Sequence, residues 1–183
     1  MAESVSPYSG GTVPDSHRSS LTARRIVTRE STIDLVAALA LDLDAVLADT
    51  RPLWNDWLED AARRARVELT DVPDDRSAAV PVLDAQLGDW RPLLERFAAD
   101  RAPVYFRPHA ETSALLRRLH SNGTRIGVFT DAPRELAAIA MAHVGAARRA
   151  DIVGTLDEVL AALGAGTAVV RTRPELAGAL QLR

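Results

Sequence analysis

Apolar and polar positions along the chain alternate in blocks that predict strands and helices in turn. Leu39–Leu43 is an apolar run that ends in acidic residues, which is typical of a buried strand. From Glu111 onward, short apolar runs of strand length alternate with segments that carry apolar residues at helical spacing. The strands predicted there are Arg125–Phe129, Asp151–Val153 and Thr167–Val170. This alternation favours an α/β fold in which a parallel sheet has helices on both faces.

The segment between the first predicted strand and the later strands has a helical pattern and forms an insertion at about 51–105. Arg51–Val67 carries apolar residues at helical spacing, a polar loop follows at Asp71–Arg76, and a second helical region covers Val80–Ala99. The tryptophans of the chain all lie in this insertion: Trp54, Trp57 and Trp90. Aromatic side chains dominate core burial, so we expect them to pack the helices together; a wall that faces the substrate is the alternative.

The N-terminal tail, residues 1–32, is rich in Ser, Gly, Pro and Arg and has no sustained apolar period. We therefore expect a disordered tail followed by a folded domain at 33–183. The tail lacks the apolar core of a signal peptide. The most apolar stretch, Leu35–Ala48, is interrupted by two aspartates and is unsuited to span a membrane. These features predict a cytoplasmic protein with no membrane partner.

The composition narrows the chemistry that the chain can perform. A net charge of −3 disfavours nucleic acid as a partner, because neutralising phosphates needs a positive surface. The absence of cysteine excludes a disulfide, a thiolate nucleophile and a cysteine-based zinc site. No lysine is present either, so all 22 basic residues are arginine. Carboxylates, hydroxyl groups and guanidinium groups are therefore the main candidates for a functional site.

Reactive residues of a parallel α/β sheet lie just beyond the carboxyl ends of its strands. Asp42 and Asp44 follow the first predicted strand, Thr130 and Asp131 follow the second, and Arg171 follows the last. One carboxylate at such an edge can attack phosphorus, and a second can move protons. A hydroxyl group and a helix start can bind an anion. These strand ends are therefore the expected position of the functional site; the resemblance described next implies that its ligand is a small phosphorylated molecule.

The segment Leu41–Thr50 has the sequence LDLDAVLADT. It resembles the first motif of the haloacid dehalogenase-like (HAD) superfamily, a strand ending in Asp-x-Asp-Gly-(Thr or Val)-Leu-x-Asp, with Ala45 in place of the glycine. The segment GVFTDAP around Thr130 resembles the second motif, a strand ending in Thr or Ser. The resemblance implies a Rossmann-like, HAD-like fold with a small helical cap inserted between these motifs. It points to the branch of phosphoglycolate phosphatase and β-phosphoglucomutase.

The resemblance also implies a role for each candidate residue. Asp42 is expected to be the nucleophile that forms an aspartyl-phosphate, and Asp44 the acid/base catalyst. Asp42 and Asp44 are also expected to hold Mg²⁺, which offsets the repulsion between a carboxylate and a phosphate. Thr130 is expected to donate its hydroxyl to a phosphate oxygen. Apart from the resemblance, we expect Asp131 and Arg171 to be further substrate-binding residues.

The second half of the family pattern is missing from this sequence. The third motif supplies a lysine, and the chain has none. The fourth supplies acidic residues after a strand, where this chain has Arg171-Thr172-Arg173. Guanidinium groups at that position oppose Mg²⁺ binding, because they place positive charge where the metal needs negative ligands. Arg171 or Arg173 could instead pair with Asp42 and Asp44 and replace the metal as a phosphate anchor; the alternative is that both point to solvent.

Two hypotheses of function follow. The leading one is a HAD-type phosphohydrolase that acts on a small phosphomonoester through an aspartyl-phosphate, weakened by the loss of the lysine and the late acids. The alternative is a catalytically degenerate HAD-like protein that binds a phosphorylated ligand or a protein partner. Because a fold does not settle function, the choice between them depends on the geometry of the site.

Overall fold

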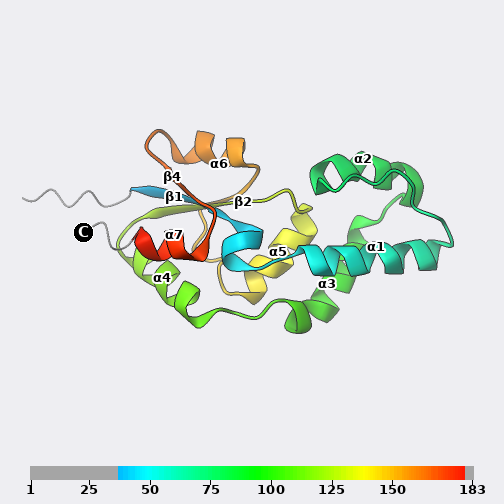
Figure 1. The fold of residues 1–183 in the computed structure, drawn as a ribbon, viewed down its shortest axis with the longest axis horizontal. Helices are drawn as coiled ribbons and strands as arrows, with labels where there is room; N and C mark the ends of the chain where they lie inside the picture. Colours follow the sequence, from blue (N-terminus) through cyan, green and yellow to red (C-terminus); the bar gives the residue numbers. More distant parts are fainter. Residues whose placement is uncertain (1–36, 180–183) are drawn as a thin grey trace, which may run out of the picture. The chain divides into compact units, whose positions relative to one another are not determined.

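The computed structural model describes residues 37–179, and a four-stranded sheet lies at its centre (Figure 1). The strand order is β3-β2-β1-β4, and every neighbouring pair is parallel. The strands are β1 (Ala38–Asp42), β2 (Arg125–Phe129), β3 (Ile152–Gly154) and β4 (Ala168–Val170). The predicted α/β fold class is confirmed, and each predicted strand is present within one or two residues of its expected bounds. The tail predicted at 1–32 lies outside the described residues.

Alternate residues of β1 serve opposite faces of the sheet, as the two-residue period of a strand requires. Leu39 and Leu41 belong to the larger core, which the helices on one face complete: α4 (Ala110–Ser121), α5 (Arg134–His143) and α7 (Arg173–Gly178). Ala38 and Ala40 face α6 (Leu156–Leu163), which covers the other side (Figure 1). Small residues point toward the single helix and large residues toward the thicker layer.

Three helices lie between β1 and α4 in the sequence: α1 (Arg51–Ala65), α2 (Arg76–Leu87) and α3 (Arg91–Tyr105). The second helical region predicted from the sequence is thus two helices, separated at Gly88, whose φ of 68° does not suit a continuing helix. The expected polar loop is one residue too long, because Arg76 is the first residue of α2, with Asp75 as its N-cap. No helix within residues 37–179 is long and apolar enough to cross a membrane.

The three tryptophans form one buried cluster between α1 and the start of α3. Their ring centroids lie 5.0 Å apart for Trp54 and Trp57, 5.3 Å for Trp57 and Trp90, and 6.1 Å for Trp54 and Trp90. These separations are typical of aromatic pairs that stabilise a core. The side chains therefore pack the helices together, as expected, and do not form a wall toward the pocket described below.

A π-helical turn, η1 (Leu43–Leu47), follows β1 directly. The Ala48 N–H donates to the Leu43 carbonyl at 2.8 Å, five residues back, which is the hydrogen bond that defines this turn. The strand consequently ends at Asp42, one residue earlier than the pattern predicts. The wide turn buries Asp44 and returns the chain so that Thr50 lies against it.

We predict that Gly127→Ala destabilises the fold. A Cβ at this position in β2 meets Val159 Cγ1 at 2.4 Å and Leu163 Cδ1 at 2.9 Å, so these side chains or α6 as a whole must shift. Overpacking of this kind costs about 1–3 kcal/mol. Gly178→Ala is the matched control, because nothing lies within 4 Å of its Cβ. Urea denaturation of both variants measures the difference; equal free energies of unfolding would contradict the tight approach of α6.

Candidate functional site

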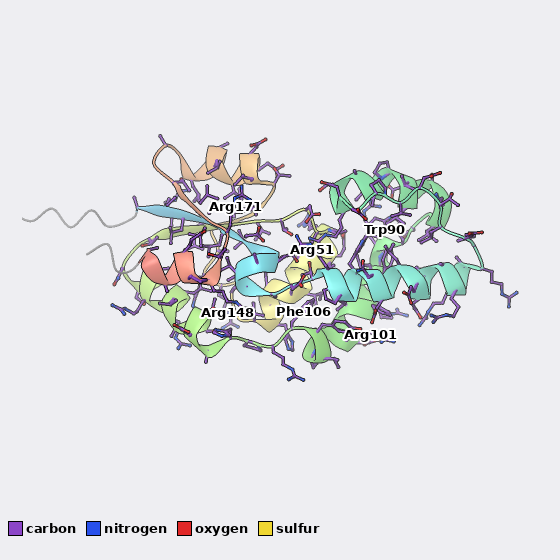
Figure 2. The ribbon with its side chains drawn as sticks, viewed as in Figure 1. Arg51, Trp90, Arg101, Phe106, Arg148 and Arg171 are labelled. Atoms are coloured by element: carbon purple, nitrogen blue, oxygen red, sulfur yellow. The ribbon has the colours of Figure 1, made fainter. Side chains whose placement is uncertain are left out.

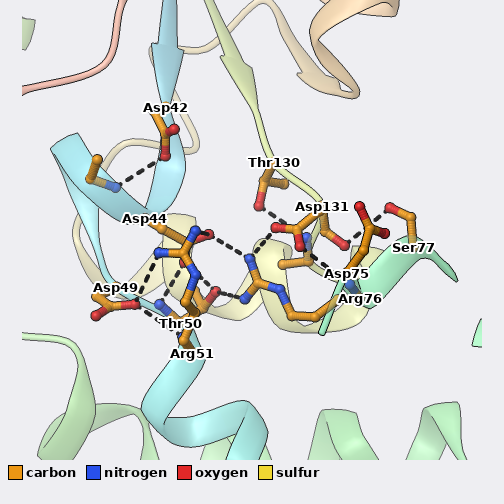
Figure 3. Close-up of polar contacts among 12 residues, drawn as sticks. Asp42, Asp44, Asp49, Thr50, Arg51, Asp75, Arg76, Ser77, Thr130 and Asp131 are labelled. Atoms are coloured by element: carbon orange, nitrogen blue, oxygen red, sulfur yellow. Dashed lines mark hydrogen bonds and ion pairs between the residues drawn. The ribbon is translucent and has the colours of Figure 1, made fainter. Parts of the chain in front are cut away.

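The carboxyl ends of the strands meet at one edge of the sheet and bring the predicted site residues together (Figure 3). Asp42 pairs in register with Phe129, so Thr130 and Asp131 follow β2 right beside the end of β1. These residues line a pocket of about 340 Å³ that also reaches Arg171 after β4. The residues around the pocket are Asp42, Asp44, Arg51, Asp75, Ser77, Phe129, Thr130, Asp131, Thr155, Leu156 and Arg171. All five residues singled out from the sequence therefore belong to one pocket.

Asp42 is half-buried at the end of β1 and acts as the N-cap of η1. Its Oδ1 accepts a hydrogen bond from the Ala45 N–H at 3.0 Å. Within residues 37–179, the Asp42 carboxylate makes no ion pair. One oxygen is thus fixed by the backbone and the other remains available to a ligand in the pocket. Because Ala45 is exposed and adopts an ordinary helical position in η1, it fulfils this backbone role without a glycine.

Asp44 has a different environment from Asp42, because it is buried and fully hydrogen-bonded. Its Oδ1 accepts from the Thr50 N–H at 2.7 Å and from the Thr50 hydroxyl at 2.6 Å. Its Oδ2 accepts from the Arg76 guanidinium at 2.5 Å. Arg51, whose side chain is mostly exposed, lies 3.9 Å away. Both oxygens of Asp44 thus accept hydrogen bonds from neighbouring residues, and the buried Arg76 balances its charge.

Arg76 is the functional residue that the sequence reasoning missed. Its side chain is only 2% exposed, and one terminal nitrogen contacts Asp44 and Asp131 together (Figure 3). The other terminal nitrogen donates to the Thr50 hydroxyl at 2.6 Å, and the Arg76 backbone N–H donates to Asp131 Oδ2 at 3.2 Å. The sequence offers only a weak indication of this role. Aspartate is favoured at a helix N-cap, and Arg76 directly follows Asp75.

Arg76 and Asp131 shift each other's pKa in the direction of an ion pair. Burial alone would raise the pKa of Asp131, but the hydrogen bonds and the charge of Arg76 outweigh it and lower that pKa below 3.8. Burial alone would lower the pKa of Arg76, because it disfavours the charged form, but the hydrogen bonds and charges of Asp131 and Asp44 raise that pKa. Both groups are therefore charged across the neutral range.

Two further arginines lie at the rim of the pocket. Figure 2 labels Arg51 at the start of α1 and Arg171 beyond β4. The guanidinium of Arg171 lies 5.2 Å from the centre of the Phe129 ring, which orients it by a cation–π contact. Arg173 instead donates to the Val46 carbonyl at 3.1 Å and does not line the pocket. Neither Arg171 nor Arg173 forms an ion pair with Asp42 or Asp44 within residues 37–179, so Arg76 takes the place that the sequence suggested for them.

A second pocket, of about 670 Å³, adjoins the first and shares Ser77, Thr130 and Thr155 with it. It extends between α5 and β3, where most of its walls are small or apolar. The residues that line only this second pocket are Ala132, Arg134, Ala137, Ala138, Met141, Ala147, Val153, Gly154 and Glu158. The two pockets together offer a polar end at Asp42 and a mainly apolar extension, as binding sites for small molecules commonly do.

The expected Mg²⁺ site does not fit the residues present. Magnesium needs several oxygen ligands in octahedral geometry. Both oxygens of Asp44 and both oxygens of Asp131 already accept hydrogen bonds, mostly from Arg76. Among residues 37–179, no group of three or more His, Asp or Glu side chains is placed to hold a metal ion. Glu175, the acid nearest after β4, accepts the Arg171 N–H at 2.7 Å.

Comparisons with known proteins assign no function to the site. No protein-family model matches the chain, and no curated protein matches it. Among solved structures, it is similar to L-2-haloacid dehalogenase from Xanthobacter autotrophicus with chloropropionic acid covalently bound, at 15% identity and a TM-score of 0.38. A second structure of that enzyme gives 16% and 0.37.

In both comparisons the alignment covers 79% of this chain and 63% of the dehalogenase. This chain thus spans less than two thirds of the dehalogenase's length. The similarity is too low to assign an activity, and the branch named above stays a prediction.

We predict that Asp131→Asn flattens the dependence of stability on pH. Because the folded pKa of Asp131 is lowered, the unfolded chain binds its proton more readily, and stability rises with pH. The contribution is complete above about pH 5 and is lost as the pH falls through the folded pKa. Asp131→Asn is expected to cost about 1–3 kcal/mol at pH 7 and to lose less on acidification.

Urea denaturation between neutral and acidic pH measures this effect. Asp74→Asn, an exposed position outside both pockets, is the matched control and is expected to follow the unmodified protein. Parallel pH profiles for Asp131→Asn and the unmodified protein would show that the Arg76 ion pair does not contribute.

Proposed function

We propose that this protein is a HAD-like hydrolase that uses Asp42 as a nucleophile toward a small phosphomonoester without a metal ion. The observation that carries the proposal is the contrast between the carboxylates of the pocket. Asp44 and Asp131 are held by Arg76, whereas among residues 37–179 Asp42 accepts only a backbone N–H on one oxygen. A carboxylate that is fixed in position and still has a free oxygen has the properties that a nucleophile needs.

The reaction proceeds in two steps that begin at this oxygen. Asp42 Oδ2 attacks the phosphorus atom, a new O–P bond forms, and the ester O–P bond breaks with its electron pair going to the leaving oxygen. Water then attacks the phosphorus of the aspartyl-phosphate and releases inorganic phosphate and the carboxylate. Thr130 lies in the same pocket, and its hydroxyl can donate to a phosphate oxygen. Arg51 and Arg171 supply positive charge at the rim.

We infer that Asp44 does not protonate the leaving oxygen, because both of its oxygens accept hydrogen bonds from Thr50 and Arg76 and it forms an ion pair with Arg76. Substrates whose leaving group departs without a proton are therefore favoured, such as aryl phosphates over alkyl phosphates. The second step lacks an activated water for the same reason. The covalent intermediate is expected to accumulate, which produces a burst of the first product.

We predict that 4-nitrophenyl phosphate gives a burst of nitrophenol of about one equivalent per chain, followed by slow turnover. Asp42→Asn abolishes both phases, while EDTA leaves them unchanged because no metal takes part. Asp74→Asn serves as the matched control and keeps the burst. Mass spectrometry of the acid-quenched protein is expected to show one added phosphoryl group. Turnover that requires Mg²⁺, or that survives Asp42→Asn, would contradict the mechanism.

The degenerate binding protein is the second candidate, and the Arg76 ion pairs favour it. A site whose acid/base residue is held in an ion pair can bind a phosphorylated ligand without turning it over. In that case 4-nitrophenyl phosphate binds, gives no burst, and Asp42→Asn strengthens binding by removing a negative charge that repels the ligand. Calorimetric titration of both forms, beside the burst measurement, separates the two candidates.

We predict that Arg171→Gln weakens the affinity for 4-nitrophenyl phosphate about tenfold, the value of one hydrogen bond to a charged group. Arg171 lines the pocket and is oriented by Phe129, so its guanidinium is available to the phosphate. Arg148→Gln is the matched control, because Arg148 is exposed and lies outside both pockets (Figure 2). The dissociation constant, or KM where turnover is measurable, reports the change. An unchanged affinity in Arg171→Gln would place the phosphate elsewhere.

A further inference from the structure

We propose that Arg76 is the resident cation of this site and bridges Asp44 and Asp131 as a bound divalent cation would. The proposal rests on the ion pairs alone and holds whether or not Asp42 turns over a substrate. It accounts for the misfit between the residues present and the Mg²⁺ that the HAD resemblance implies. In this protein the positive charge is part of the polypeptide.

The geometry is that of a bridging cation. A single terminal nitrogen of Arg76 contacts Oδ2 of Asp44 at 2.5 Å and also contacts Oδ1 of Asp131. The two carboxylates come from different strand ends, because Asp44 follows β1 and Asp131 follows β2. They are separated from Arg76 by 32 and 55 positions in the sequence. Figure 3 shows the guanidinium lying between them.

The remaining groups close the network around this cation. Thr50 Oγ1 accepts from Arg76 at 2.6 Å and donates to Asp44 at 2.6 Å. The backbone N–H of Arg76 donates to the second oxygen of Asp131. Among the buried side-chain nitrogen and oxygen atoms of the described residues, only Arg76 Nε lacks a hydrogen-bond partner. Such a nearly complete set of partners is what allows an arginine that is 98% buried to remain charged.

A guanidinium differs from a metal ion in that it cannot dissociate from the chain. Arg76 is the first residue of α2, and the N-cap hydrogen bond of Asp75 to the Ala78 N–H fixes the helix start from which the side chain extends. The charge at the carboxylates is therefore independent of the metal concentration. Removing the guanidinium leaves Asp44 and Asp131 facing each other with the Thr50 hydroxyl nearby. These are oxygen ligands of the kind that Mg²⁺ and Mn²⁺ bind.

Arg76→Gln tests this inference by removing the charge while it keeps a polar side chain. In EDTA, its melting temperature is expected to fall below that of the unmodified protein, because the buried Asp44 and the partly buried Asp131 lose their counter-charge. Adding MnCl₂ is expected to raise its melting temperature progressively with concentration, as binding to the folded state alone requires. The unmodified protein is expected to bind no Mn²⁺ in the millimolar range by electron paramagnetic resonance and to show no such rise.

Two controls isolate the position of the cation. Arg91→Gln removes a half-buried arginine that pairs with Asp84 at 2.7 Å, away from the Asp44 and Asp131 carboxylates. This variant is expected to melt near the unmodified protein without a response to MnCl₂. Arg76→Gln combined with Asp131→Asn removes one of the two carboxylates and is expected to lose the response to MnCl₂. The response therefore needs both acids and the absence of the guanidinium.

Three results would overturn the inference. The first is binding of Mn²⁺ by the unmodified protein with a rise in its melting temperature. The second is a folded Arg76→Gln variant that ignores MnCl₂. The third concerns an Arg76→Gln variant that is unfolded in EDTA. If MnCl₂ does not restore its helical circular dichroism signal, a metal ion does not replace Arg76, and the inference fails.

Discussion

The contact of one buried guanidinium with two carboxylates holds the site of this protein together. Removing Arg76, Asp44 and Asp131 from water has a large desolvation cost, which attraction offsets only where the geometry is good and the other polar atoms are satisfied. That condition is met here apart from Arg76 Nε, which is buried without a partner. Apolar residues of similar size could fill the same volume. The ionic contact adds specificity, because only one placement of α2 lets a single side chain reach two strand ends.

This contact is a consequence of the sheet topology. Parallel strands end at the same edge, so acids that follow β1 and β2 are brought close together whether or not their charges are balanced. Asp42, Asp44 and Asp131 all lie there, and their repulsion grows in a partly buried pocket. A cation is thus a structural requirement of the fold with this sequence. A metal ion and an arginine both satisfy it, and the arginines after β4 make the metal the less favoured of the two.

The sequence predicted the sheet, its helices and the pocket at the strand ends, because those features depend on local patterns. The apolar run before Asp42 and the one before Thr130 identify buried strands, and parallel pairing then places their ends together. Arg76 was out of reach for the opposite reason. Its partners are distant in the sequence, and a single charged residue beside a helix start is usually exposed to solvent. The π-helical turn was missed because its i+5 bond leaves no repeat that a pattern can reveal.

Because Arg76 holds two of the three acids, it determines what the third can do. Asp42 and Asp44 are two residues apart and both line the pocket, yet Asp44 belongs to a buried ionic network, whereas one oxygen of Asp42 has no hydrogen-bond partner within residues 37–179. Nucleophilic attack needs only that oxygen and a fixed backbone. Proton transfer needs a group that can exchange a proton with the substrate, whereas both oxygens of Asp44 accept hydrogen bonds from Thr50 and Arg76. Under the proposed function, chemistry at this site is therefore confined to substrates that react with a nucleophile without help from an acid, whichever molecule enters the apolar extension beside it.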